Sequence, residues 1–227
     1  MSTVAASRPA VDQATRRRVG KAFLLAAGSW VAYLVLAFTV SAGYEEALVD
    51  ASEATDTPVN RLPAETLAEI TADHPWSNLS ALVLVFVPVL LILAVRRARA
   101  VTGERWGVRL AWLGAAVWWF YFLLNAGLAA GPESLPPLTR DLDVLTVPLV
   151  SAGSVLAVAA FVLSALGLRR AGWRPWATAI AAGVALVLAA VSVVTLVTSG
   201  FDEPVPPIAL LPAELIVGIA LLVGSRR

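Results

Sequence analysis

Six long apolar blocks, separated by short polar segments, limit most strongly what this chain can fold into. A helix that crosses the roughly 30 Å hydrocarbon layer of a membrane needs about 20 mostly apolar residues. The chain has 227 residues, of which 59% are hydrophobic and only 15% charged, whereas a soluble domain carries about 25% charged residues. The pattern predicts an all-α fold, a polytopic transmembrane helical bundle with six spans, at residues 22–42, 79–95, 108–130, 144–168, 177–199 and 208–224.

The first and last blocks each allow a second interpretation. Residues 208–224 are short for a span and contain Pro212 and Glu214, so five spans plus a re-entrant segment is the competing count. Residues 22–42 follow a basic leader and end in small residues, as a cleaved signal peptide does. Their apolar core, however, is about twice as long as the 7–15 residues usual for a signal core. We therefore interpret this block as a retained span.

The positions of the basic residues predict the orientation of the bundle, because Lys and Arg gather in the cytoplasmic loops of membrane proteins. With the N-terminus inside, fifteen of the seventeen basic residues fall on the cytoplasmic side, and only Arg61 and Arg140 fall outside. Residues 1–21 then form a basic cytoplasmic N-terminus, and residues 22–227 form a single transmembrane domain. We expect a multi-pass protein of the inner (plasma) membrane of a bacterium, with both termini cytoplasmic.

The first outer loop, residues 43–77, is acidic. Residues 44–60 carry few large apolar side chains, so we expect this half of the loop to be loosely ordered. The second half predicts a short helix, because Pro63 fits a first helical turn and the segment after it is rich in helix formers. Leu67 and Ile70 would share one face of that helix, which could rest on the membrane surface.

Several classes of function are disfavoured by what the sequence lacks. There is no cysteine, hence no thiolate nucleophile and no cysteine-ligated metal. His74 is the sole histidine, too few ligands for a metal site, so we predict neither a metal nor another cofactor. No nucleic-acid-binding motif or phosphate-binding loop occurs, and the two halves show no inverted repeat. An intramembrane enzyme is also disfavoured, because catalysis usually needs two or more converging ionisable groups, and we predict no catalytic residue.

Glu214 is the polar residue that most needs an explanation. It is the only one of the sixteen acidic residues that falls inside an apolar block, where a charge costs about 2.5–3.5 kcal/mol. Counted from Ile208, it lies roughly 9 Å into its span, in the outer leaflet. Asn125, Thr195 and Ser192 fall at the same depth in their own spans. These four residues are the predicted ligand- or proton-binding site, a small polar pocket that opens outward.

Two readings of Glu214 remain open at this point. In one, the carboxyl responds to a proton or a cation, or anchors a polar ligand. In the other, it is a neutral acid that joins two helices by a hydrogen bond. Pro212 raises a similar choice, because it frees a backbone carbonyl that could bind a cation but could equally mark an ordinary kink. The run from Trp118 to Tyr121 is interpreted as packing against lipid, with an aromatic wall for a ligand as the alternative.

Small residues recur every four positions in two blocks, at Gly107, Ala111 and Ala115 and again at Ala177, Ala181, Ala185 and Ala189. Such stripes let helices approach closely. They predict a tightly packed bundle and do not indicate an activity.

Three segments resemble a group of uncharacterised six-span bacterial integral membrane proteins. They are residues 168–176 (LRRAGWRPW), residues 212–218 (PAELIVG) and the acidic, partly helical first outer loop. The resemblance covers most of the chain in layout and implies the same six-span fold, with Glu214 as a regular feature. No activity comes with it, because none is known for that group.

Two functions follow from these observations. The first hypothesis is a binding, accessory or envelope role, with the lipid bilayer and another membrane subunit, or a second copy of the chain, as partners, and with no nucleic acid. The alternative is a small proton- or cation-coupled transporter or exporter in which Glu214 exchanges the ion. At 227 residues the chain is small for a transporter and would need to dimerise.

Overall fold

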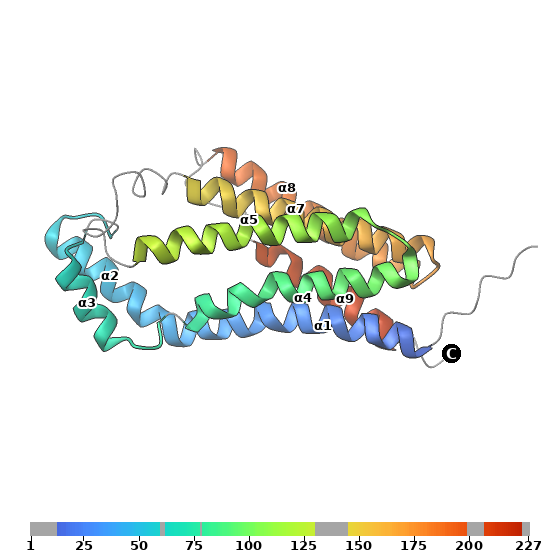
Figure 1. The fold of residues 1–227 in the computed structure, drawn as a ribbon, viewed down its shortest axis with the longest axis horizontal. Coiled ribbons are helices and arrows are strands. Elements are labelled where there is room, and N and C mark those ends of the chain that lie inside the picture. Colours follow the sequence, from blue (N-terminus) through green and yellow to red (C-terminus); the bar gives the residue numbers. More distant parts are fainter. Residues whose placement is uncertain (1–12, 60–61, 78, 130–144, 199–206, 224–227) are drawn as a thin grey trace, which may run out of the picture.

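The computed structural model describes residues 13–59, 62–77, 79–129, 145–198 and 207–223. Within these residues the protein is all-helical and has no strand. The long helices run side by side along the longest axis of the molecule, and two short helices, α2 and α3, form a hairpin at one end (Figure 1). The all-α bundle predicted from the apolar blocks is confirmed at this level.

The chain starts with a long helical segment. Helix α1 (Gln13–Leu36) continues without a break through a π-helical turn (Ala37–Ser41) into α2 (Ala42–Thr55). Asp56 ends α2 in a left-handed conformation, with φ of 49°. Helix α3 (Ala64–Asp73) returns alongside α2.

The remaining helices follow the predicted blocks closely. They are α4 (Leu79–Thr102), α5 (Trp106–Ala129), α7 (Thr146–Arg170), α8 (Pro175–Thr198), a 3₁₀ turn (Pro207–Ala209) and α9 (Leu210–Val223). Among the described residues, four helical segments are long and apolar enough to cross a membrane: Gln13–Thr55, Trp106–Leu124, Thr146–Arg170 and Pro175–Thr198. Helix α9 is apolar but shorter, at 14 residues.

The first half of the acidic loop differs from the expectation of loose order, because residues 42–55 are helical. The prediction of loose order rested on the low content of large apolar residues and was wrong for these residues. This segment is rich in Ala and Glu, which have high helix propensity, and it extends a helix that already exists, so it bears no nucleation cost. Ser41 anchors the junction: its hydroxyl donates to the Ser77 carbonyl at 2.8 Å and lies 2.8 Å from the Ser80 hydroxyl.

Small and aromatic residues fill the core between the helices. Helix α1 packs against α4 and α9, α5 against α7, and α8 against α7 and α9. Phe23 and Phe161 meet edge to face at the centre, with ring centroids 5.7 Å apart. Ala177, Ala181 and Ala185 are fully buried, so the predicted alanine stripe of α8 does face neighbouring helices.

Helices α1 and α9 approach each other most closely at Gly218. A β-carbon added to this glycine would lie 2.7 Å from two side-chain carbons of Leu24 and 3.1 Å from the Leu24 nitrogen. One added to Gly20 would lie 3.0 Å from the Gly218 carbonyl oxygen. These contacts bring the end of α9 beside the start of α1, at the end of the bundle opposite the α2–α3 hairpin (Figure 1).

Candidate functional site

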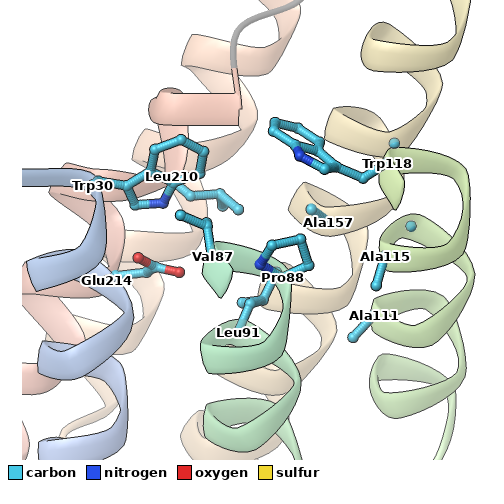
Figure 2. Close-up of a pocket in the computed structure, with 12 residues that line it drawn as sticks. Trp30, Val87, Pro88, Leu91, Ala111, Ala115, Trp118, Ala157, Leu210 and Glu214 are labelled. Atoms are coloured by element: carbon cyan, nitrogen blue, oxygen red, sulfur yellow. The ribbon is translucent and has the colours of Figure 1, made fainter. Parts of the chain in front are cut away.

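Glu214 is buried in the middle of the helical bundle. It is the fifth residue of α9, and only 1% of its surface is exposed. Helix α9 can carry it there because it packs on α1 and α8, so that a side chain on its inner face points between helices. In Figure 2 the carboxyl group projects from α9 towards the space between α1 and α4.

A small cavity adjoins the Glu214 side chain. The space that the centre of a water molecule can occupy in it is about 20 Å³. Residues of α1, α4, α5, α7 and α9 line this cavity, and most of them are small or apolar: Trp30, Val87, Pro88, Leu91, Ala111, Gly114, Ala115, Trp118, Gly153, Ala157, Leu210 and Glu214. Glu214 is the only ionisable residue among these lining residues.

Four polar atoms of the lining have no hydrogen-bond partner within the described part of the chain. They are Oε1 and Oε2 of Glu214, Nε1 of Trp30 and Nε1 of Trp118. An unsatisfied buried polar group costs about 1–3 kcal/mol, and native proteins contain only a few of them. The three residues that carry these atoms come from three helices, and all three line this cavity (Figure 2).

An aromatic layer covers the cavity on the side of the α2–α3 hairpin. Trp30 packs edge to face on Trp118 at 6.3 Å and on Tyr33 at 6.4 Å, and Trp118 contacts Phe122 at 5.9 Å. Leu84, Ile208 and Leu211 pack around the same cluster. The cavity therefore adjoins a cluster of aromatic rings.

The position of the cavity along the bundle follows from the lining residues of the long helices. Among the lining residues, Trp30 lies nine positions beyond Lys21 in α1, or about 14 Å along the helix. Leu91 lies five positions before Arg96 in α4, or about 8 Å. On α7, Gly153 lies seven positions after Thr146, towards the opposite end of that helix from Arg169 and Arg170, so the cavity lies between the two ends of the bundle. Helix α9 begins inside the bundle, where Ile208 and Leu211 pack against the cluster of the buried Trp30.

Two of the other predicted site residues, Thr195 and Ser192, are not among the residues that line this cavity. Thr195 is exposed on α8, and its hydroxyl donates to the Val191 carbonyl of its own helix at 3.1 Å. Ser192 is half-buried and donates in the same way to Leu188 at 2.9 Å. Asn125 belongs to α5, but its side chain lies outside the described residues. Thr195 and Ser192 bond to backbone because a helix always offers a carbonyl four residues back.

The two tryptophans are the site residues that the sequence did not identify. Trp30 lies in mid-block, far from the span ends where tryptophans normally concentrate, and that position was the available signal. Trp118 was assigned to lipid packing, yet it is only 5% exposed. Its neighbour Phe120, at 50% exposed, does face outward. Neighbouring positions point about 100° apart on a helix, and composition does not show which one faces the interior.

The prolines and the histidine contribute little to the site. Pro88 lines the cavity and cannot donate to the carbonyl of Leu84 one turn earlier. Pro212 is half-buried and is not part of the lining. His74 lies by the hairpin, where its Nδ1 is 3.0 Å from the Ile70 carbonyl oxygen. Over the described ranges, no three His, Cys, Asp or Glu residues are grouped so that they could hold a metal ion.

Comparisons with protein-family models, with curated proteins and with solved structures find no match for this chain.

Proposed function

We propose that this chain is a six-span protein of the inner membrane, with both termini in the cytoplasm. The four long apolar helical segments support four spans. Helix α4 adds a fifth, because it has 24 residues and its three arginines, Arg96, Arg97 and Arg99, all fall in its last third. Helix α9 adds the sixth. Its own 14 residues extend about 21 Å, and it packs lengthwise against α1.

The basic residues of the bundle support this orientation. Arg97 reaches the backbone of α1, where its Nη1 donates to the Arg18 carbonyl at 3.2 Å, and Arg16 lies over the ring of Trp173 at 5.3 Å. The starts of α1 and α8 and the end of α4 therefore meet in one arginine-rich layer. Such a layer belongs on the cytoplasmic side of a membrane.

A reporter fused after Arg227 tests this topology. We expect an enzyme that is active only outside the cytoplasm to be inactive in this fusion, and a cytoplasmic fluorescent protein to be bright. The same reporters inserted after Thr57, beyond the end of α2, should give the reverse result. External activity of the fusion after Arg227 would contradict six spans and restore the five-span count.

We further propose that the protein has a binding, accessory or envelope role, centred on a small polar site at Glu214. The observation that carries this proposal is the group of four unpaired polar atoms around one cavity. Apolar residues of similar volume that replace buried ionic groups are often neutral or stabilising, so packing alone does not require a carboxyl at this position. A buried carboxyl that has no hydrogen-bond partner among the described residues is better explained by a role in binding.

This proposal predicts that Glu214→Leu makes the isolated protein more stable. The substitution removes two unpaired oxygens and keeps a similar volume, so the free energy of unfolding should rise by about 1–3 kcal/mol. The measurement is thermal unfolding in a mild detergent, with Glu214→Gln as the polar control of the same shape. Glu214→Gln should change stability little, because an amide is also left without protein partners.

A loss of stability in Glu214→Leu would support the opposite reading, in which the carboxyl joins two helices by a hydrogen bond. In that case Glu214→Gln would retain the stability and Glu214→Leu would lose it. The two readings therefore predict opposite signs for one substitution.

A further inference from the structure

We propose that the outward face at the start of α1 binds one anionic phospholipid of the cytoplasmic leaflet, with the lipid phosphate held by Arg17, Arg18 and Lys21. This end of α1 lies at the end of the bundle opposite the α2–α3 hairpin (Figure 1). The inference rests on the proposed orientation, since the face must lie on the cytoplasmic side. It concerns a surface separate from the cavity at Glu214.

The three basic residues share one face of α1, because residues three and four positions apart are neighbours on a helix. All three are exposed, and together with Gln13 and Ala14 they line an open hollow in the surface. The space in this hollow that the centre of a water molecule can occupy is about 410 Å³, whereas a single water needs about 10–15 Å³ in the same measure. The hollow is therefore large enough for a phosphate group and the rest of a lipid headgroup.

A fourth cation comes from the neighbouring helix. Nη1 of Arg97 donates to the Arg18 carbonyl oxygen at 3.2 Å, which holds this guanidinium beside the basic face of α1. Neither α1 nor α4 contains an acidic residue, and the like charges of Arg17 and Lys21, four positions apart, repel each other. An anion from outside these two helices would relieve this repulsion, and guanidinium groups match the paired oxygens of a phosphate.

The same face of α1 continues as an apolar surface. Beyond Lys21 its exposed side chains include Leu25, Val31 and Val35, at 55%, 46% and 54% exposed, and nothing lies within 4 Å of a β-carbon added to Gly28. From Leu25 to Val35 the helix rises about 15 Å, which is half of the roughly 30 Å hydrocarbon layer. A lipid whose headgroup lies at the basic residues therefore finds one leaflet's depth of apolar helix for its acyl chains. A free phosphate ion would leave that surface uncovered.

A second copy of the chain fits this face poorly. Two copies in one membrane have the same orientation, so a two-fold interface here would place the same patch against itself. The basic residues of both copies would then meet at the same depth, and such like-charge contacts are costly. Arg16 differs from this set, because its guanidinium lies over the ring of Trp173, 5.3 Å from the centroid.

Titration of the full-length protein in detergent with single lipids, followed by native mass spectrometry, tests the proposal. We expect one phosphatidylglycerol to bind at least about tenfold more tightly than a phosphatidylcholine with the same acyl chains, because each basic residue near the membrane surface attracts an anionic headgroup. The combined variant Arg17→Gln, Arg18→Gln and Lys21→Gln should reduce this preference to less than about twofold. In the unmodified protein the preference should also shrink as ammonium acetate rises from about 0.05 to about 0.5 M, since salt screens exposed charges.

The combined variant Arg99→Gln, Arg105→Gln and Arg169→Gln is the matched control. These arginines are also exposed and fall at the end of α4, between α4 and α5, and at the end of α7. Their loss removes the same charge from the arginine-rich end of the bundle but leaves the face of α1 intact, so the lipid preference should be unchanged. Because all six substituted positions are exposed, both combined variants should keep the melting temperature of the unmodified protein.

Equal affinity of the unmodified protein for the two lipids would overturn this inference. So would an equal loss of preference in the control variant, because the lipid would then respond only to total charge. Displacement of phosphatidylglycerol by inorganic phosphate at the same concentration would make a free anion the ligand, and a dimer that forms in place of the lipid complex would make a second copy the occupant. The proposed function fails on different measurements, namely the stability of Glu214→Leu and the reporter fused after Arg227.

Discussion

Gly218→Leu should abolish the folded state of this protein, or lower its free energy of unfolding by at least about 3 kcal/mol. The first added carbon alone would lie 2.7 Å from two carbons of Leu24 and 3.1 Å from its backbone nitrogen, and leucine adds three more carbons beyond it. Helix α9 cannot retreat without exposing Val217 and Leu221, which are buried against its neighbours. The expected readout is loss of the monodisperse peak in size-exclusion chromatography after mild heating in detergent.

Gly28→Leu is the matched control for this substitution. Gly28 lies on α1, two turns beyond Gly20, and nothing lies within 4 Å of a β-carbon placed there. The same leucine should therefore change stability by no more than about 0.5 kcal/mol, as surface substitutions usually do. Equal tolerance of leucine at both positions would mean that α1 and α9 are not packed as described.

Phe161→Ala is the second substitution for which we expect a large effect. The Phe161 ring is fully buried in α7 and meets Phe23 of α1 edge to face, with centroids 5.7 Å apart. Its removal leaves a cavity where two helices meet, and losses of about 3–5 kcal/mol are typical for Phe→Ala in a core. In a membrane, helix association depends on such van der Waals packing, because lipid tails are as apolar as the side chains. The apparent melting temperature in detergent should fall well below that of the unmodified protein.

Phe120→Ala provides the comparison for Phe161→Ala. Phe120→Ala removes the same kind of ring, but from α5. The Phe120 ring is 50% exposed, on a surface that faces lipid in the proposed topology. It should lower the melting temperature only slightly. A comparable drop for both variants would place Phe120 in an interface that a single copy of the chain does not contain.

The candidate site was only partly predictable from the sequence. Glu214 could be identified, because a lone carboxyl in an apolar block is costly wherever its helix packs. Its supposed partners could not, because depth along a helix says nothing about which way a side chain points. Thr195 lies on the outer surface of α8 and Ser192 bonds to its own backbone. Trp30 and Trp118 do line the cavity, but the sequence marked them only by their positions in mid-block.

The sequence by itself determined the fold class and where along the chain the long helices lie, although the first helical segment runs from Gln13 to Thr55, well beyond the predicted block 22–42. The reason is that an apolar stretch of membrane-spanning length has almost no stable alternative to a helix, whichever neighbours it finds. Only the tertiary structure decided where α9 begins, how deep Glu214 lies and which residues surround it. These features depend on contacts between helices far apart in the chain, such as Gly218 against Leu24. A sequence pattern cannot show such contacts when every face of the helix is apolar.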